Sequence, residues 1–173
     1  MKRYLMVGIA ILVAACGSSS PSTPSNTLPT KVTFTAALNP ANEVPPVTNA
    51  DSSGSGTGTF TLDLTRDSAG AITAAKATFV FSLNNFPANS SLILAHIHTG
   101  GPGATGSPIV NTGLTAASAV AMPNGSVTNQ TFANIDVTPT NAQQIIDNPN
   151  GFYYNVHTAL NSGGAARAQL VKQ

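Results

Sequence analysis

The chain has few charges, few aromatic residues and a single cysteine. Charged residues make up 8% of its 173 residues, aromatic residues make up 6%, and tryptophan is absent. From Cys16 onward there are five basic and six acidic residues, a net charge of −1, so the sequence carries no basic surface for nucleic acid or for anionic lipid. We therefore expect no nucleic-acid partner. One cysteine also excludes a disulfide within the chain.

Sequence motifs of common enzyme classes are absent as well. There is no Gly-x-Ser-x-Gly and no His-Glu-x-x-His motif, and segment 100–106 lacks the Lys-Ser/Thr of a phosphate-binding loop, so we interpret it as a surface turn. Glu43 is the only glutamate, and no second carboxylate lies at a spacing that suggests glycoside hydrolysis. No catalytic residue is predicted, and a non-enzymatic role is favoured over an enzyme.

The N-terminal residues 1–15 have the pattern of a lipoprotein signal peptide. Lys2 and Arg3 precede an apolar run over 4–15, shorter than the roughly 20 residues that span a bilayer. Small residues before Cys16 resemble the bacterial lipobox, which implies cleavage before this cysteine and acyl chains on the mature residue. The alternative is a buried free cysteine. Gly17, in place of an aspartate, favours the outer membrane or the cell surface.

Residues 16–30 are predicted to connect the lipid to a folded domain. After Cys16 the composition changes to serine, proline, threonine and asparagine, which cannot bury a core. We expect a flexible, solvated tether that holds the domain on the membrane outside the cytoplasm. The folded domain is predicted over residues 31–173.

The rest of the sequence predicts an all-β domain, an antiparallel Greek-key or Ig-like β-sandwich. Short apolar segments alternate with Gly/Pro turns, as is typical of sandwiches and barrels. One short helix is expected near residues 139–147, capped by Thr138 and with Pro139 in its first turn. Eight strands are expected: 31–38, 59–65, 71–83, 91–98, 107–110, 126–135, 152–158 and 165–171.

Turn and loop signals separate these strands. Residues 67–70 (Asp-Ser-Ala-Gly) predict a hairpin turn, and the two prolines within 42–46 are expected to interrupt strand pairing. The Gly/Ser-rich segment 51–58 is interpreted as a mobile loop. Alternation places one set of apolar side chains, at 60, 62 and 64, on a single face of its strand.

The three histidines of the chain form a candidate metal site. His96 and His98 lie on one face of a predicted strand, about 6.6 Å apart along it. His157 lies late in another predicted strand. If the two strands are neighbours, three imidazoles could bind copper or zinc. The alternative is that these histidines only form hydrogen bonds with backbone or hydroxyl oxygens.

Glu43 and Arg167 are a second candidate pair. Arg167 lies in an apolar predicted strand, where a charge should be paired or at a rim. We predict an ion pair with Glu43 that fixes the proline-rich segment 42–46. The alternative is a solvated arginine on an edge strand.

Three parts of the sequence form a pattern when taken together: 34–38 with 42–46, 95–100, and 153–158 with 166–170. In this order they resemble the CHRD domain, a family named after chordin and widespread in bacterial secreted proteins. The family pattern near the end usually reads Gly-Glu-Ile-Arg-Gly-Gln-Leu, whereas residues 164–170 here lack the glutamate and the second glycine.

The resemblance implies a β-sandwich similar to Ig-like or superoxide-dismutase folds, and it implies no established activity. The His96-Ile97-His98 segment is also similar to the copper-ligand strand of Cu,Zn superoxide dismutases, but the disulfide cysteines and zinc-loop histidines have no counterpart. Two functions stay open. One is a lipid-tethered binding or structural module of the cell envelope, with a protein or matrix partner. The other is a copper- or zinc-binding envelope protein for storage, delivery or redox defence.

Overall fold

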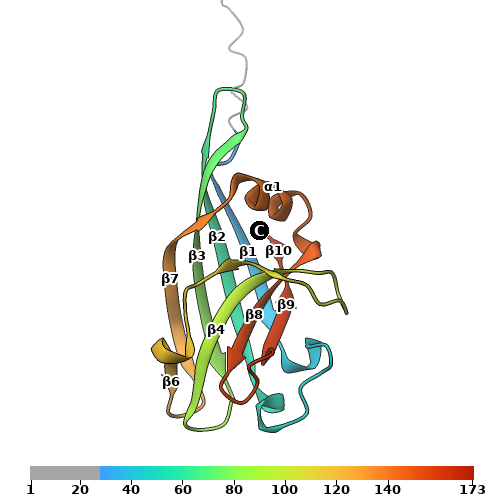
Figure 1. Cartoon of the computed structure of the whole chain (residues 1–173), viewed down its shortest axis with the longest axis vertical. Helices are drawn as coiled ribbons and strands as arrows, with labels where there is room; N and C mark the ends of the chain where they lie inside the picture. The colour runs from blue at the N-terminus through green and yellow to red at the C-terminus, as the bar shows by residue number, and fades with distance from the viewer. Residues whose placement is uncertain (1–27) are drawn as a thin grey trace, which may run out of the picture.

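The computed structural model describes residues 28–173, so the predicted signal peptide, Cys16 and most of the predicted tether lie outside the described residues. The described chain forms two antiparallel sheets that pack face to face (Figure 1). The predicted all-β sandwich with one short helix is therefore confirmed. In this part of the chain no helix is both long and apolar enough to cross a membrane.

The first sheet has the strand order β10-β1-β2-β3-β7 and the second has the order β5-β4-β8-β9, with β6 also paired to β4. The chain builds β1, β2 and β3 as a meander, crosses to β4, returns to the first sheet with β7 and crosses again to β8. The strands are β1 Lys31–Leu38, β2 Ser55–Arg66, β3 Ile72–Asn84, β4 Ser90–Thr99, β5 Pro108–Asn111, β6 Val120–Met122, β7 Val127–Val137, β8 Phe152–Thr158, β9 Ala166–Gln169 and β10 Val171–Lys172.

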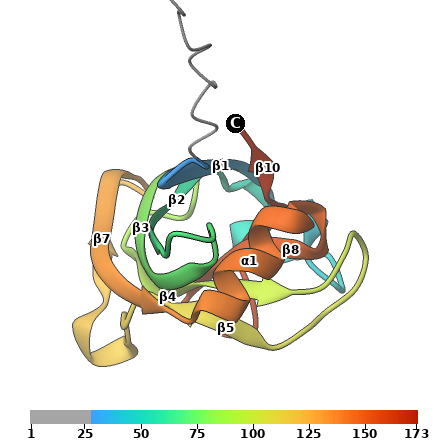
Figure 2. The ribbon, with the colours of Figure 1, turned by 90° about the horizontal axis from the view of Figure 1, so that it is seen from above.

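The helix α1, Pro139–Asp147, forms where the sequence predicts it. Thr138 accepts a hydrogen bond from the Asn141 backbone N–H at 3.2 Å, which caps the first turn. Ala142 and Ile145 are fully buried on its inner face. Figure 2 shows α1 lying across one end of the sandwich.

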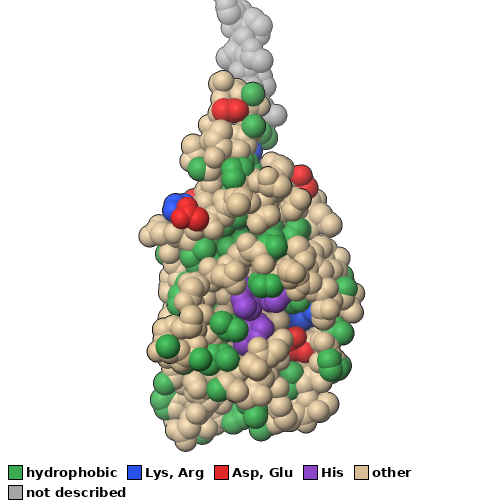
Figure 3. Space-filling model, in the orientation of Figure 1, with side chains coloured by type: hydrophobic (Ala, Val, Ile, Leu, Met, Phe, Trp, Pro, Cys, Tyr) green, Lys and Arg blue, Asp and Glu red, His purple; other side chains and the backbone are tan. Residues whose placement is uncertain are grey.

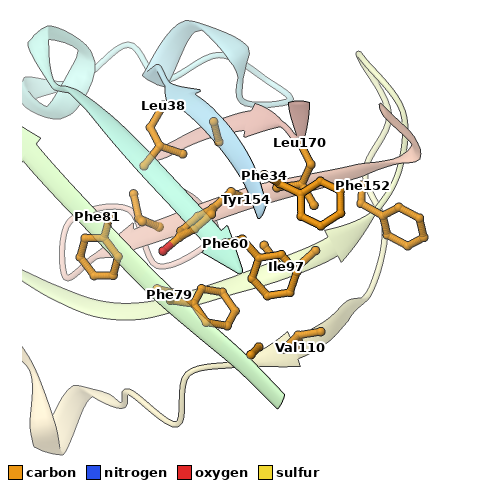
Figure 4. Close-up of a cluster of buried hydrophobic side chains, with 14 of the residues drawn as sticks. Phe34, Leu38, Phe60, Phe79, Phe81, Ile97, Val110, Phe152, Tyr154 and Leu170 are labelled. Carbon is orange, nitrogen blue, oxygen red and sulfur yellow. The ribbon is translucent and has the colours of Figure 1, made fainter. Parts of the chain in front are cut away.

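The core lies between the sheets and is aromatic. Phe60 and Phe79 pack edge to face with ring centroids 5.0 Å apart, and Phe79 contacts Tyr154 of the opposite sheet at 5.4 Å. Figure 4 shows these rings with Ile97 from β4. The side chains predicted to share one face of the 59–65 strand, Phe60, Leu62 and Leu64, are all buried.

The prediction of a mobile loop over 51–58 is wrong. A short 3-10 helix, Ala50–Ser53, leads directly into β2, which begins at Ser55. The glycines are needed for packing, because a Cβ on Gly58 would lie 3.0 Å from the ring of Tyr154. Here glycine lets a strand approach a core aromatic ring rather than marking a flexible segment.

The end of the chain also differs from the prediction of one strand over 165–171. β9 pairs with β8 in the second sheet, whereas β10 pairs with β1 in the first sheet. Leu170 is the buried corner between them. The strand β6 was not predicted, because three residues give too short a pattern to detect.

Candidate metal centre

The polar site lies on the outer face of the second sheet. In β4, Ala95 and Ile97 point into the core, so the alternation of the strand directs His96 and His98 to the opposite face. In β8, Tyr154 and Val156 are core residues by the same alternation. Tyr153, Asn155 and His157 therefore lie on the outer face with the β4 histidines. All five of these polar side chains are buried.

β4 and β8 are adjacent antiparallel strands, which is the arrangement that a shared site for the three histidines requires. His157 is opposite Leu94 in the register, one pleat from His96. The ring centroids of His96 lie 4.7 Å from His98 and 4.5 Å from His157. One nitrogen of each ring lies within 4.8 Å of the corresponding nitrogen of the other two. In Figure 3 the histidine side chains (purple) form one group, beside a basic (blue) and an acidic (red) side chain.

The Nδ1 atom of each ring contacts an oxygen. His98 Nδ1 lies 2.8 Å from the Gly106 carbonyl, and His157 Nδ1 lies 2.9 Å from the Ser162 carbonyl. A carbonyl only accepts, so both rings must carry a proton on Nδ1. His96 Nδ1 lies 2.8 Å from Asn111 Oδ1. In its neutral form each carbonyl-bonded ring presents the lone pair of Nε2 to the site.

The three Nε2 atoms differ in their hydrogen bonding. His98 Nε2 is buried without a hydrogen-bond partner, and His96 Nε2 lies 2.6 Å from His157 Nε2. Because the His157 ring donates through Nδ1, its Nε2 has only a lone pair to offer when neutral. A tetrahedral ion with bonds of about 2.0 Å would separate two such nitrogens to about 3.3 Å, so a modest opening of the pair would admit it.

Burial keeps the three imidazoles neutral. It lowers the pKa of His96 to about 4, with a further lowering by His157. Burial also lowers the pKa of His98 and of His157, against the opposing effect of their backbone hydrogen bonds. Neutral imidazole is the form that binds a metal ion. The three buried histidines could therefore hold one ion.

Sequence reasoning missed the groups that orient these rings. Asn111 is on β5, opposite His96 in the register, and the carbonyls of Gly106 and Ser162 belong to loops. A backbone carbonyl leaves no signal in the side-chain pattern. Tyr153 could have been found, because it shares the strand alternation of His157.

Arg167 and Tyr153 extend the polar face away from the histidines. The Tyr153 ring stacks on His98 with centroids 4.8 Å apart, and the Arg167 guanidinium carbon lies 4.1 Å from the Tyr153 centroid. Arg167 is only 2% exposed, so the alternative of a solvated edge arginine is wrong. The guanidinium is placed by contact with an aromatic face.

Glu43 and Arg167 line the same pocket but form no direct ion pair. The salt bridges within residues 28–173 are Lys31–Asp63 and Lys76–Asp136. Burial raises the pKa of Glu43 to about 7, and the positive charge of Arg167 opposes that rise only in part. Gly164, with φ of 142°, closes over the carboxyl, where a Cβ would lie 2.6 Å from Glu43 Oε2. The predicted ion pair is therefore wrong: the two side chains line one pocket without a salt bridge between them.

Comparison with known proteins gives one positive result. No curated protein and no solved structure matches the chain. The family model of the CHRD domain matches residues 34–170, which include most of both sheets, the three histidines, Glu43 and Arg167. This match extends over most of the chain, and the protein therefore belongs to the CHRD domain family.

Proposed function

We propose that this CHRD domain binds one zinc or copper ion through the Nε2 atoms of His96, His98 and His157. The observation that carries the proposal is that the two nitrogens of each histidine ring have different surroundings. The Nδ1 atoms contact neighbouring oxygens, whereas the Nε2 atoms converge: that of His98 has no hydrogen-bond partner, and those of His96 and His157 have only each other. Metal-binding histidines are oriented in this way in proteins of known metal content.

A purely structural role explains less of the arrangement. Histidines that only form hydrogen bonds do not need to bring their second nitrogens together, and His98 Nε2 would stay buried without a partner. The pair of Nε2 atoms 2.6 Å apart can share at most a proton. One cation would satisfy all three nitrogens at once.

The donor set defines the class of metal. Three neutral nitrogens without a thiolate or carboxylate suit zinc or copper rather than calcium or magnesium. Three protein ligands leave a fourth position for water or an exchangeable ligand, which is the pattern of reactive or transport sites rather than closed structural ones. Such an ion would supply Lewis acidity or, if it is copper, redox chemistry.

Metal titration of the purified, metal-stripped protein tests this proposal. We expect one equivalent of zinc or copper to bind, and His98→Ala to abolish tight binding while the far-UV circular dichroism stays unchanged. Asp67→Ala, in the exposed β2–β3 turn, is the control and should bind like the wild type. Absence of uptake at micromolar metal, or full uptake by the His98 variant, would exclude the site.

We also propose that the domain acts outside the cytoplasm, held to a membrane. Membership of the CHRD family supports an extracellular-type binding module. The signal-peptide pattern and Cys16 support a lipid anchor, with the domain held by the 16–30 tether at the outer membrane or cell surface. There it would meet a protein or matrix partner, or the metal itself. A Cys16→Ser variant should lose incorporation of a labelled fatty acid and leave the membrane fraction; unchanged labelling would contradict the anchor.

A further inference from the structure

We propose that the pocket beside Glu43 and Arg167 binds a small monocarboxylate, such as a short aliphatic acid or a carboxylate group of a larger ligand. This site lies on the same outer sheet face as the histidines, but it is lined by different residues. The pocket has a volume of about 450 Å³. It goes beyond the proposed metal centre and does not require a metal.

The guanidinium of Arg167 is an unpartnered cation at this pocket. Arg167 is almost fully buried, lines the pocket, and its Nε has no hydrogen-bond partner. The backbone carbonyl of Arg167 accepts a hydrogen bond from Asn42 Nδ2 at 3.0 Å, and this contact does not involve the guanidinium. A buried cation that lacks an acceptor is costly. An oxyanion in the pocket would supply that acceptor.

The carboxyl-bearing residue Glu43 lines the same pocket. Its Oε1 is also buried without a partner. Within residues 28–173 the carboxyl is not part of a salt bridge, and burial favours its protonated form. A protonated Glu43 donates one hydrogen bond and so complements a carboxylate that Arg167 holds.

The side-chain amides of the lining, on Asn42 and Gln169, are already engaged, which leaves Arg167 as the main side-chain donor. Gln169 Nε2 donates to the backbone carbonyls of Gly100, Asn150 and Phe152. One cation beside a carboxyl favours a singly charged anion over a phosphate or sulfate dianion, which Glu43 would repel on ionisation. One end of the pocket is therefore suited to a single carboxylate.

The remaining wall is apolar and accommodates the body of the ligand. Ala41, Val44, Pro46, Pro102 and Ala168 contribute carbon surface to the pocket. A charged group at one end and an apolar wall at the other fit a short aliphatic acid. The two prolines have fixed φ angles, which limits the flexibility of this wall.

Titration of metal-stripped protein with propionate tests the proposal by NMR. We expect saturable binding at one site and a shift of the Arg167 Nε–Hε resonance. Arg167→Gln should weaken binding by about tenfold or more, because charge-assisted hydrogen bonds are lost. Lys76→Gln, which removes an exposed cation, should bind like the wild type. If Arg167→Gln does not fold, the shift of the Arg167 Nε–Hε resonance in the wild-type protein still tests the proposal.

Three results would overturn the assignment. The first is an Arg167 Nε–Hε resonance that does not shift when propionate is added. The second is an affinity of Arg167→Gln for propionate equal to that of the wild type. The third is an affinity of the wild type for methyl phosphate equal to that for propionate. Because the protein is tested without metal, failure here leaves the histidine site untouched. Failure of the metal titration likewise leaves this pocket to be judged by its own result.

Discussion

At the scale of single residues, metal binding depends on which nitrogen of each histidine ring forms a hydrogen bond with a neighbouring oxygen. His98 and His157 each use Nδ1 to donate to a carbonyl, and this choice presents Nε2 to the site. His96 is oriented by a side chain, Asn111 Oδ1, rather than by the backbone. Asn111 is therefore the one orienting group among the three that a substitution can remove.

We expect Asn111→Ala to lower metal affinity by about 10- to 100-fold, because His96 loses the partner that fixes its ring. The measurement is a competition titration against a chelator of known affinity. Asn150→Ala, at an exposed asparagine outside the site, is the matched control. Equal affinities for the two variants would show that Asn111 does not position His96.

Glu43 makes stability depend on pH. Burial raises its pKa from 4.5 to about 7, so the folded protein holds this proton more tightly than the unfolded chain does. The free energy of unfolding contributed by Glu43 is therefore fully present below about pH 4.5, declines as the pH rises toward 7 and levels off above it.

Urea unfolding of Glu43→Gln and wild type at pH 5 and pH 8 measures this effect. The glutamine does not ionise, so it does not lose stability as the pH rises. The free energy of unfolding of the variant minus that of the wild type should therefore be larger at pH 8 than at pH 5. The histidines, whose shifts have the opposite sign, are present in both proteins and cancel in the comparison. A stability difference that is the same at both pH values would contradict the account.

At the scale of elements, the face on which a strand residue lies could be predicted from the alternation of side chains. Which strands are neighbours could not. The sequence shows that His96 and His98 share one face, and that apolar residues fill the other. It does not show that β8 lies next to β4, because that contact joins segments about 60 residues apart and has no local signature. The same limit explains Arg167: its strand pattern was visible, whereas its burial against Tyr153 depends on neighbouring strands.

The glycines of β2 show that a Gly/Ser-rich composition does not always indicate a loop. Gly58 was interpreted as part of a loop, although it is a strand residue beneath the Tyr154 ring. We expect Gly58→Val to destabilise the domain by about 1–3 kcal/mol through overpacking. Denaturant unfolding should show this loss, whereas Gly101→Val, where an added Cβ meets no atom within 4 Å, should be nearly neutral. A neutral Gly58→Val would mean that the core yields easily at this point.

At the scale of the whole molecule, the metal site and the core share the same sheet. β4 and β8 carry the histidines on one face, and Ile97 and Tyr154 on the other, where the two sheets meet. An ion held by both strands would therefore tie the central pair of the second sheet together from outside the core. Binding to the folded state alone must raise the stability of the whole domain.

We expect the melting temperature to rise on addition of zinc and to return on addition of a chelator. At a free metal concentration 100 times Kd, the stabilisation should be about 2.7 kcal/mol. Differential scanning calorimetry of wild type and His98→Ala measures it. A rise of equal size in the variant would assign the effect to adventitious binding elsewhere.

X-ray absorption spectroscopy of the protein loaded with one equivalent of zinc tests the central claim most directly. The account predicts three imidazole nitrogens at about 2.0–2.1 Å, with one water or exchangeable ligand completing the coordination. A coordination shell of oxygens with fewer than two imidazoles would contradict it, and the three histidines would then be no more than a buried polar cluster of the sandwich.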